Sequence, residues 1–355
     1  MRERKLHSGQ DEVLRLRFSF LDIMSRQYHV AIVGATGAVG LEMLDVLDRR
    51  AFPVSELTLL SSARSAGKKI AFRGADIVVK ELTADSFAGV DIALFSAGSG
   101  ISKEFAPAAV AAGAVVVDNS SAFRMDDQVP LVVPEINGSD VKNHRGIIAN
   151  PNCTTAITLM GIYPLHQRFR VRRVFASSYQ AVSGAGAQAI EELRTQVEAV
   201  AAGRPTQPSV FAHQIAFNVI PQVDGFLETG YTKEEMKLQN EGRRIMHLSM
   251  FRASVTCVRV PVYRAHCVAV SAEFEKPINL SEARHAIEAF PGIRIRDNVA
   301  QNQYPMPLDV AGKDDCEIGR MRLDCALDNA ISFWICGDQL LKGAALNAVQ
   351  IAELL

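Results

Sequence analysis

The stretch 28–50, YHVAIVGATGAVGLEMLDVLDRR, decides the fold. It opens with an apolar run, YHVAIV, that predicts a buried strand. A glycine-rich turn, GATGAVG, follows, and after it apolar residues recur at helical spacing, at Val39, Met43, Leu44 and Leu47. A second apolar run, ELTLL, predicts another strand. Strand, turn, helix and strand in this order predict a parallel crossover unit, because consecutive parallel strands need such a connection.

The same alternation continues to about residue 152. Further apolar runs begin at Ile77, Asp91, Ala114 and Gly146, and a helical pattern, SKEFAPAAVAAG, lies between the second and the third of them. Short apolar runs that alternate with helical segments are typical of a doubly wound α/β domain with a parallel sheet. We therefore predict an α/β fold that begins with a Rossmann-type domain.

The composition bounds the class of protein. A chain of 355 residues suggests two domains, at roughly 150 residues per domain. Its 48% hydrophobic and 22% charged residues and its net charge of -1 are ordinary for a globular protein. No basic stripe is visible for nucleic acid, and no apolar run approaches the ~20 residues of a membrane-spanning helix. We expect a soluble protein that binds neither nucleic acid nor a membrane.

The cysteines and the N-terminal residues indicate the compartment. Six cysteines lie between residues 153 and 336 without a CxxC pair or a histidine cluster, so we expect no metal site. A chain this long buries a core without disulfides, which favours a reducing cytoplasm. The first residues mix acids and bases, unlike a signal or transit peptide. We predict that residues 1–23 are a disordered extension or an artefact of a start site upstream of Met24.

Gly34, Gly37 and Gly40 form a G-x-x-G-x-x-G sequence between the first predicted strand and the first predicted helix. Glycines there permit a tight turn and a close approach of the backbone to a pyrophosphate, while the helix N-terminus offers free N–H groups. A generic strand-to-helix turn would look similar, but this position favours dinucleotide binding. The other turn residues expected to contact the cofactor are Thr36, Ala38 and Val39.

The second predicted strand ends in basic rather than acidic residues. An NAD-binding fold places Asp or Glu there on the ribose hydroxyls, whereas this chain continues SSARSAGKK. A carboxylate would repel a 2'-phosphate, whereas Arg64, with Ser65 beside it, can bind one through two hydrogen bonds. The sequence therefore favours NADP, although a solvated basic loop is the alternative.

Cys153 is the best-placed nucleophile. It lies in ANPNCTT, where a predicted strand ends and an apolar helix begins. A helix N-terminus lowers the pKa of a thiol by favouring the thiolate, so we predict a reactive cysteine. The alternative is a small core residue, which we expect for the other five cysteines.

Nine collinear segments resemble one enzyme family. They are GATGAVG, SSARSAG, VVDNSSAFR, VVPEING, IANPNCTT, SSYQAVSGAG, EEMKLQNEGRRI, CVRVPVYRAH and KGAALNAVQIAE. Together they resemble aspartate-β-semialdehyde dehydrogenase. The resemblance implies reductive dephosphorylation of L-aspartyl-4-phosphate with NADPH, which yields L-aspartate 4-semialdehyde, NADP and phosphate. This reaction serves the biosynthesis of lysine, threonine and methionine.

The resemblance also assigns roles to residues. It makes Cys153 the nucleophile that forms a thioacyl intermediate, His266 the general acid/base and Gln180 a residue that orients the substrate. It makes Arg259 the residue that binds the substrate carboxylate. The other substrate contacts that it implies are Glu241 at the amino group and Arg124, Asn152 and Arg244 at the phosphate. The other cofactor contacts that it implies are Ser183, Gly184 and Asn347.

Glu241 and Arg244 lie three residues apart on a helix predicted over 232–246, so they would share one side of it. The family usually has lysine where this chain has Arg244. Arginine keeps the charge but has a longer, planar head group. Without the resemblance, this pair would equally fit an ion pair on the surface of a helix.

The resemblance completes the domain plan. Residues 24–152 and 337–355 are predicted to form the NADP-binding domain, to which the C-terminal segment returns as an amphipathic helix. Residues 153–336 are predicted to form an α+β catalytic and dimerisation domain, on the two-domain plan of glyceraldehyde phosphate dehydrogenase. We expect a homodimer or a dimer of dimers, with 203–230 as a loop or a dimer-contact arm.

Two other interpretations stay open. N-acetyl-γ-glutamyl-phosphate reductase and phosphorylating glyceraldehyde phosphate dehydrogenase share the thioacyl chemistry, so the nucleophile and the glycine turn do not exclude them. The segments RVPVYRAH and SYQAVSG and the helix with Glu241 and Arg244 instead match the pattern of the aspartyl enzyme. A non-catalytic NADP-binding protein would bind the cofactor without turnover.

Overall fold

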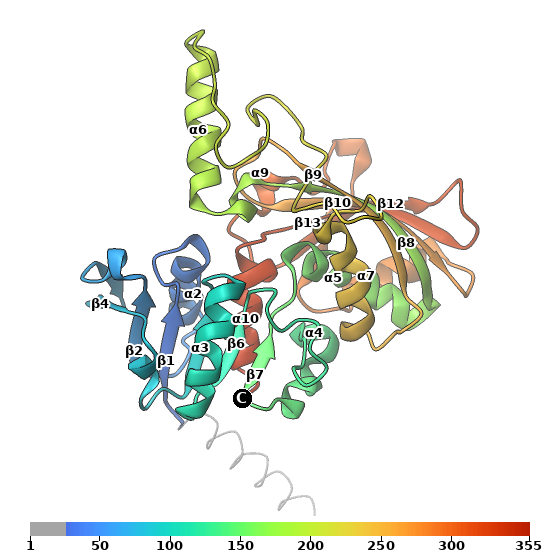
Figure 1. The fold of residues 1–355 in the computed structure, drawn as a ribbon. Coiled ribbons are helices and arrows are strands. Elements are labelled where there is room, and N and C mark those ends of the chain that lie inside the picture. Colours follow the sequence, from blue (N-terminus) through green and yellow to red (C-terminus); the bar gives the residue numbers. More distant parts are fainter. Residues whose placement is uncertain (1–25) are drawn as a thin grey trace, which may run out of the picture.

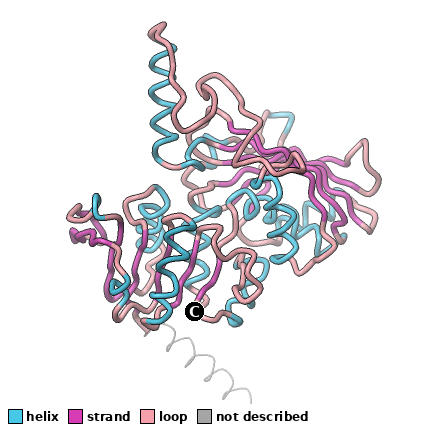
Figure 2. The backbone as a smooth tube through the Cα atoms, viewed as in Figure 1, coloured by secondary structure: helices cyan, strands magenta, loops and turns pink. Residues whose placement is uncertain are grey.

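The computed structural model describes residues 26–355. The predicted extension 1–23 lies outside these residues. The described chain forms two sheets (Figure 1, Figure 2). The first sheet has a hydrophobic core on each face, and the second packs on a core of its own. Among the described residues no helix has the length and apolar character needed to cross a bilayer.

The first sheet has seven strands in the order β3-β4-β2-β1-β5-β6-β7. Their bounds are Tyr28–Val33 (β1), Val54–Ser61 (β2), Lys69–Phe72 (β3), Ala75–Glu81 (β4), Ile92–Phe95 (β5), Val115–Asp118 (β6) and Ile147–Ala149 (β7). All neighbours pair in parallel except β3, which pairs antiparallel with β4. The sequence analysis did not predict β3. It follows a turn and joins β4 in a hairpin whose bend, Arg73 and Gly74, has positive φ angles of 47° and 79°.

Helices cover both faces of this sheet. The helices α2 (Ala38–Arg49) and α10 (Leu346–Ala352) contact each other and share one apolar core with β1. The helix α3 (Ser99–Ala111) packs into a second core on the opposite face, against β5 and β6. This two-sided arrangement confirms the predicted doubly wound α/β fold, which places ligands at the carboxyl ends of the strands.

The second sheet has six strands in the order β11-β12-β13-β10-β8-β9. Their bounds are Val171–Gln180 (β8), Arg252–Arg259 (β9), His266–Phe274 (β10), Ile293–Ile295 (β11), Cys316–Leu323 (β12) and Ala330–Gly337 (β13). The helices α5 (Cys153–Phe169), α7 (Lys233–Ile245) and α8 (Leu280–Glu288) pack on one face. The other face exposes aromatic side chains, among them Phe175 and Tyr179, because side chains alternate along β8.

The remaining helices are α6 (Ala187–Ala201), which projects from the body in Figure 1, and the short α4 (Pro134–Asn137) and α9 (Pro307–Val310). The stretch 203–230 contains no helix or strand, which confirms the loop prediction. Four of the five cysteines that were expected in the core are buried, but the prediction is wrong for Cys325, which is exposed.

The C-terminal segment returns to the first sheet, but it is not amphipathic. Residues 335–349 are almost all buried, and the segment opens with a π-helical turn, Leu341–Ala345, before α10. The prediction of an amphipathic helix was wrong because this segment packs against both α2 and α5. A helix covered by neighbours on several sides needs no polar face.

Candidate active site

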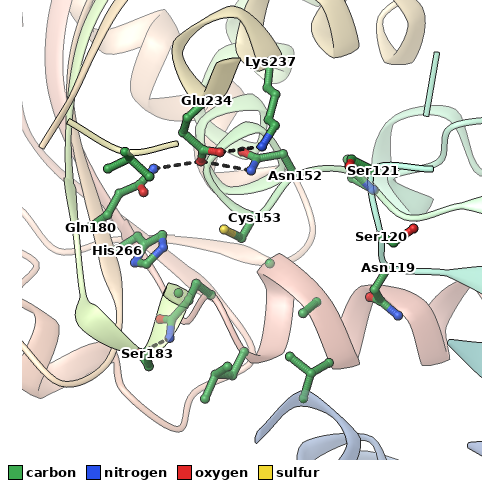
Figure 3. A pocket seen from close by; sticks show the side chains of 18 of the residues that line it. Asn119, Ser120, Ser121, Asn152, Cys153, Gln180, Ser183, Glu234, Lys237 and His266 are labelled. Atoms are coloured by element: carbon green, nitrogen blue, oxygen red, sulfur yellow. Dashed lines mark hydrogen bonds and ion pairs between the residues drawn. The ribbon is translucent and has the colours of Figure 1, made fainter. Parts of the chain in front are cut away.

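A cavity of about 320 Å³ lies between the two sheets. The first domain contributes Val39, Ser96, Gly98 and the run Asn119–Ser121 to its lining. The second domain contributes Cys153, Gln180, Ser183, Gly184, Glu234, Lys237, Arg259 and His266. In Figure 3 Cys153 lies between Gln180 and His266 on one side and the run Asn119–Ser121 on the other. Within residues 26–355 no group of three or more His, Cys, Asp or Glu side chains could hold a metal ion.

Cys153 is the first residue of α5, as predicted from its position after a strand. Asn152 caps the helix, and its Oδ1 accepts a hydrogen bond from the backbone N of Thr155 at 3.0 Å. The cysteine is half-buried, and burial together with the charge of Glu234 raises the pKa of its thiol to about 11. The predicted lowering of this pKa by the helix N-terminus is therefore wrong.

Glu234 is the centre of the polar network above Cys153 (Figure 3). Its Oε1 accepts hydrogen bonds from Nδ2 of Asn152 and Nε2 of Gln180, each at 3.0 Å. Its Oε2 accepts a hydrogen bond from Nζ of Lys237 at 2.7 Å. Although Glu234 is only 8% exposed, these partners lower the pKa of its carboxyl to about 2 against the cost of burial. A buried, ionised carboxylate therefore faces the cavity.

Glu241 and Arg244 do not line this cavity, so their predicted contacts with substrate need correction. Glu241 accepts hydrogen bonds from the backbone N of Asn152 at 2.7 Å and from Nη1 of Arg124 at 3.2 Å. The guanidinium of Arg244 donates to backbone oxygens, including that of Val129 at 3.0 Å, and lies against a separate surface hollow. The charged residues of α7 that line the cavity are instead Glu234 and Lys237, which lie two turns earlier on this helix.

Arg124 lines the cavity as predicted by the resemblance, and its guanidinium is fixed on three sides. Besides Glu241, it donates from Nε to the backbone oxygen of Asn150 at 2.9 Å and from Nη2 to that of Asn119 at 2.8 Å. Asn347 lies behind these residues, fully buried, and donates to Oδ1 of Asn150 at 2.6 Å. The structure thus places Asn347 outside the cavity lining, behind Asn150, which is hydrogen-bonded to the lining residues Asn119 and Arg124.

His266 begins β10 and is fully buried at the cavity wall. The backbone N–H of Ala181 donates to its Nδ1 at 3.1 Å, so the neutral ring carries its proton on Nε2. No described atom accepts a hydrogen bond from Nε2. Burial, and then the charge of Arg259, lowers the pKa of His266 to about 3. The ring is neutral near pH 7 and presents one unpaired N–H.

Arg259 ends β9 and is 6% exposed. Its Nη1 donates to the backbone oxygen of Ala181 at 2.7 Å, and no carboxylate within residues 26–355 forms an ion pair with it. Burial lowers the pKa of Arg259, but an arginine stays charged at neutral pH. The cavity therefore contains a buried cation that lacks an anionic partner, which fits a carboxylate ligand.

The glycine turn has the geometry expected of a nucleotide site. Gly34 has a φ of +87°, and a Cβ on Gly40 would lie 2.4 Å from the oxygen of Gly34, so neither position accepts a larger residue without a shift. Gly37 caps α2 without a side chain, which leaves the first N–H groups free for a phosphate. Thr36 and Ala38 lie in the same turn, but of its residues only Val39 reaches the cavity.

Arg64 and Ser65 lie beside this turn, at the end of β2. Oγ1 of Thr36 is 3.0 Å from Oγ of Ser61, and the short 3₁₀ turn Ala63–Ser65 follows. Ser65 is buried, whereas Arg64 is exposed and forms no ion pair with any described carboxylate. The side chain of Arg64 is therefore free to bind an anion at this edge of the sheet.

Glu234, Lys237 and Gln339 are among the cavity residues that escaped the sequence analysis. Glu234 and Lys237 have the same acid-x-x-base spacing as Glu241 and Arg244, and this repeated spacing was the sequence signal that could have found them. Gln339 is 2% exposed, donates to Oγ of Ser183 and accepts from the backbone N of Ala265 at 2.7 Å. No local motif marks Gln339, because its partners come from distant parts of the chain.

Comparisons with known proteins identify the family to which the chain belongs. Residues 29–144 match a model of the semialdehyde dehydrogenase NAD binding domain, and residues 162–342 match a model of the semialdehyde dehydrogenase dimerisation domain. The chain is 51% identical to the aspartate-semialdehyde dehydrogenase of Aquifex aeolicus, over 92% of this chain and 98% of the relative. It is 46% identical to that of Bacillus subtilis, over 94% of this chain and 98% of the relative.

A solved structure of the same kind of enzyme is also similar to this chain. Aspartate semialdehyde dehydrogenase II of Vibrio cholerae, complexed with ASA, superposes with a TM-score of 0.91 at 44% identity and covers 93% of this chain and 98% of its own. The two family models match residues on either side of Cys153, which itself lies between the two matched ranges. Because proteins of one kind match nine-tenths of its length, the chain belongs to the aspartate-semialdehyde dehydrogenase family of oxidoreductases.

Proposed function

We propose that this protein converts L-aspartyl-4-phosphate to L-aspartate 4-semialdehyde and phosphate with NADPH. One observation carries the choice of substrate: an ionised carboxylate, Glu234, and an unpaired guanidinium, Arg259, both line the cavity of Cys153. A free α-amino acid bears the ammonium and the carboxylate that complement this pair. N-acetylglutamyl phosphate has no ammonium for Glu234, and glyceraldehyde phosphate has neither group.

The phosphate of the substrate has its own donors in this proposal. Lys237 and Arg124 line the cavity on the side of Asn152, and all three side chains carry N–H groups. Cationic donors that converge on a leaving phosphate stabilise the charge that develops on it. Glu241, buried and bonded to both Arg124 and Asn152, holds two of these donors in place.

Cys153 attacks the acyl carbon, phosphate leaves, and a thioester forms at Sγ. His266 first donates a hydrogen bond from Nε2 to the acyl oxygen as negative charge builds up there, and Nε2 is the atom through which it acts as acid or base. Gln180, held by Glu234 and by Oγ1 of Thr154 at 2.5 Å, keeps the substrate oriented. An ammonium at Glu234 cancels the negative charge that raises the pKa of Cys153, so substrate binding favours the thiolate.

When bound, a nicotinamide dinucleotide would supply a hydride for the reduction of the thioester. The residues present fit it: the turn Gly34–Val39 for the pyrophosphate, and Ser183 and Gly184 at the cavity for the nicotinamide end. NADP is proposed over NAD because Arg64 lies exposed beside the turn, where a 2'-phosphate would bind. Asn347 supports the cavity wall through Asn150.

We further propose that the protein works in the cytoplasm as a homodimer, or as a dimer of dimers. The match of residues 162–342 to a dimerisation domain supports the homodimer. All six cysteines are free, which fits a reducing compartment. Light scattering on the purified protein distinguishes two chains from four.

The experiment that tests the function follows NADP reduction with L-aspartate 4-semialdehyde and phosphate, in the wild type and in Cys153→Ala. We expect wild-type activity that needs phosphate and is absent from the variant. Turnover of N-acetylglutamate semialdehyde or glyceraldehyde 3-phosphate in its place would overturn the substrate. Faster turnover with NAD than with NADP, unchanged by Arg64→Ala, would overturn the choice of cofactor.

A further inference from the structure

The guanidinium of Arg259 is held by groups that bear no negative charge. Its Nη1 donates to the backbone oxygen of Ala181 at 2.7 Å. Gly184 lies so close that a Cβ there would be 2.9 Å from the same Nη1. The ring of Phe211 lies on another side, with its centroid 5.7 Å from Cζ of Arg259. At this distance the face of an aromatic ring attracts a cation.

Phe211 does not line the cavity, so it reaches the substrate only through Arg259. It belongs to the loop 203–230, which the sequence analysis left without a function. Its ring is partly buried against a small apolar cluster formed by α6 and the residues around it. The members of this cluster are Val182, Ala189, Leu193, Ile215, Ala216 and Ile220. The ring is therefore packed on one side and faces a cation on the other.

Two buried side chains of α6 fix the loop on both sides of Phe211. Glu192, 5% exposed, accepts hydrogen bonds at Oε2 from the backbone N of Ser209 at 3.1 Å and of Val210 at 2.5 Å. Gln196, 2% exposed, accepts at Oε1 from the backbone N of Ile215 at 2.9 Å. Hydrogen bonds immediately before and shortly after Phe211 leave its backbone little freedom, which is how a ring is kept in one place.

An aromatic face suits this position for a physical reason. A carboxylate beside Arg259 would hold the guanidinium as firmly, but it would also neutralise the charge that a substrate carboxylate needs. The ring attracts the cation through its quadrupole and accepts no strong hydrogen bond, so the N–H groups remain available. Phe211 can thus orient Arg259 without competing with its ligand.

We propose that Phe211 is a positioning residue that holds Arg259 ready for the α-carboxylate of the substrate and thereby sets the affinity for it. The proposal rests on the proposed function, in which Arg259 binds that carboxylate. It assigns to the loop 203–230, and to Glu192 and Gln196 beneath it, a part in substrate recognition.

The test compares Phe211→Leu, which keeps an apolar side chain without the ring, with Phe211→Tyr, which keeps the aromatic face. Steady-state assays on the full-length enzyme give the KM for L-aspartate 4-semialdehyde, phosphate and NADP. We expect Phe211→Leu to raise the KM for the semialdehyde about tenfold, the equivalent of one desolvated cation–π contact. The KM for phosphate and for NADP should stay within about twofold, because neither ligand needs Arg259. Phe211→Tyr should restore the wild-type KM for the semialdehyde.

A matched control and a double-mutant cycle separate positioning from folding. Phe217→Leu alters an aromatic residue of the same loop that is 72% exposed, and it should leave all three KM values unchanged. In an Arg259→Met background, Phe211→Leu should have less than a third of its effect on kcat/KM, because the cation is gone.

The proposal is overturned if Phe211→Leu leaves the KM for the semialdehyde unchanged, or raises all three KM values together. It also fails if the effects of the two substitutions are simply additive. A wild-type enzyme that does not turn over L-aspartate 4-semialdehyde would instead overturn the proposed function. The assay of the wild type therefore tests the proposed function, and the assays of the variants test the role of Phe211.

Discussion

Gly343→Ala is the substitution that most directly tests how Cys153 is positioned. Gly343 lies in the π-helical turn against the start of α5, and an added Cβ would lie 2.6 Å from Cβ of Cys153 and 3.1 Å from its Cα. Ordinary contacts begin near 3.4 Å, so one side must move by about 0.8 Å. Neither side can move freely, because both the turn and the start of α5 are packed in the interior.

The size of the effect follows from this displacement. A reacting group misplaced by about 1 Å loses roughly 100-fold in rate, so we expect kcat to fall by about two orders of magnitude. If the turn moves instead of the nucleophile, the overpacked interior lowers the free energy of unfolding by about 1–3 kcal/mol and spares kcat.

Phosphate-dependent NADP reduction measures kcat, and denaturant unfolding measures stability. Gly225→Ala serves as the control, since nothing lies within 4 Å of a Cβ at Gly225. A Gly343→Ala enzyme that matches the wild type both in kcat and in unfolding free energy would refute the claim that this glycine sets the place of Cys153.

Three further outcomes are expected. Lys237→Met should raise the KM for phosphate at least tenfold, whereas Arg244→Lys should leave it within about twofold, because only Lys237 lines the cavity. Equal effects of the two substitutions in steady-state kinetics would contradict this placement. The pKa of His266 is lowered from its usual 6.5 to about 3, so the neutral ring stabilises the fold above pH 6.5, and this stabilisation is lost as the pH falls toward 3. His266→Asn should therefore flatten this part of a plot of unfolding free energy against pH. An unchanged plot would count against a buried neutral ring. Lys342→Met leaves the carboxylate of Glu135 buried without its ammonium partner and should lower the free energy of unfolding by about 3–5 kcal/mol. The double variant Lys342→Met/Glu135→Leu should recover this stability. A Lys342→Met protein that is as stable as the wild type in urea would show that the pair is dispensable.

The first domain could be predicted because its signals are local. Each strand from β1 to β7, except β3, is an apolar run bounded by turn residues, and the glycines of the first turn carry a backbone requirement that the sequence displays directly. The start of α5 at Cys153 could be placed for the same reason, since Asn152 is a capping residue next to an apolar helix.

The substrate contacts on α7 could not be assigned from spacing alone. Glu234 and Lys237, like Glu241 and Arg244, lie three residues apart, and seven residues separate the two pairs. Seven residues make nearly two full turns, so both pairs lie on one side of the helix, about 10 Å apart along its axis. Which pair reaches the cavity depends on how far α7 extends past α5, which is set by tertiary packing.

The pKa of Cys153 was mispredicted for a related reason. The helix N-terminus is visible in the sequence, whereas the burial of the thiol and the carboxylate of Glu234 beside it are not. The polar network of Gln339, Ser183 and Ala265 likewise joins residues that only the folded chain brings together.

The buried C-terminal segment also bears on how the protein is made in the cell. Because translation runs from the N-terminus, residues 338–352 leave the ribosome after every element that they pack against. Until they do, the nucleophile lacks the turn around Gly343, and the carboxylate of Glu135 lacks its ammonium partner. The surroundings of Cys153 are therefore completed late in synthesis, when residues 338–352 pack against α2 and α5.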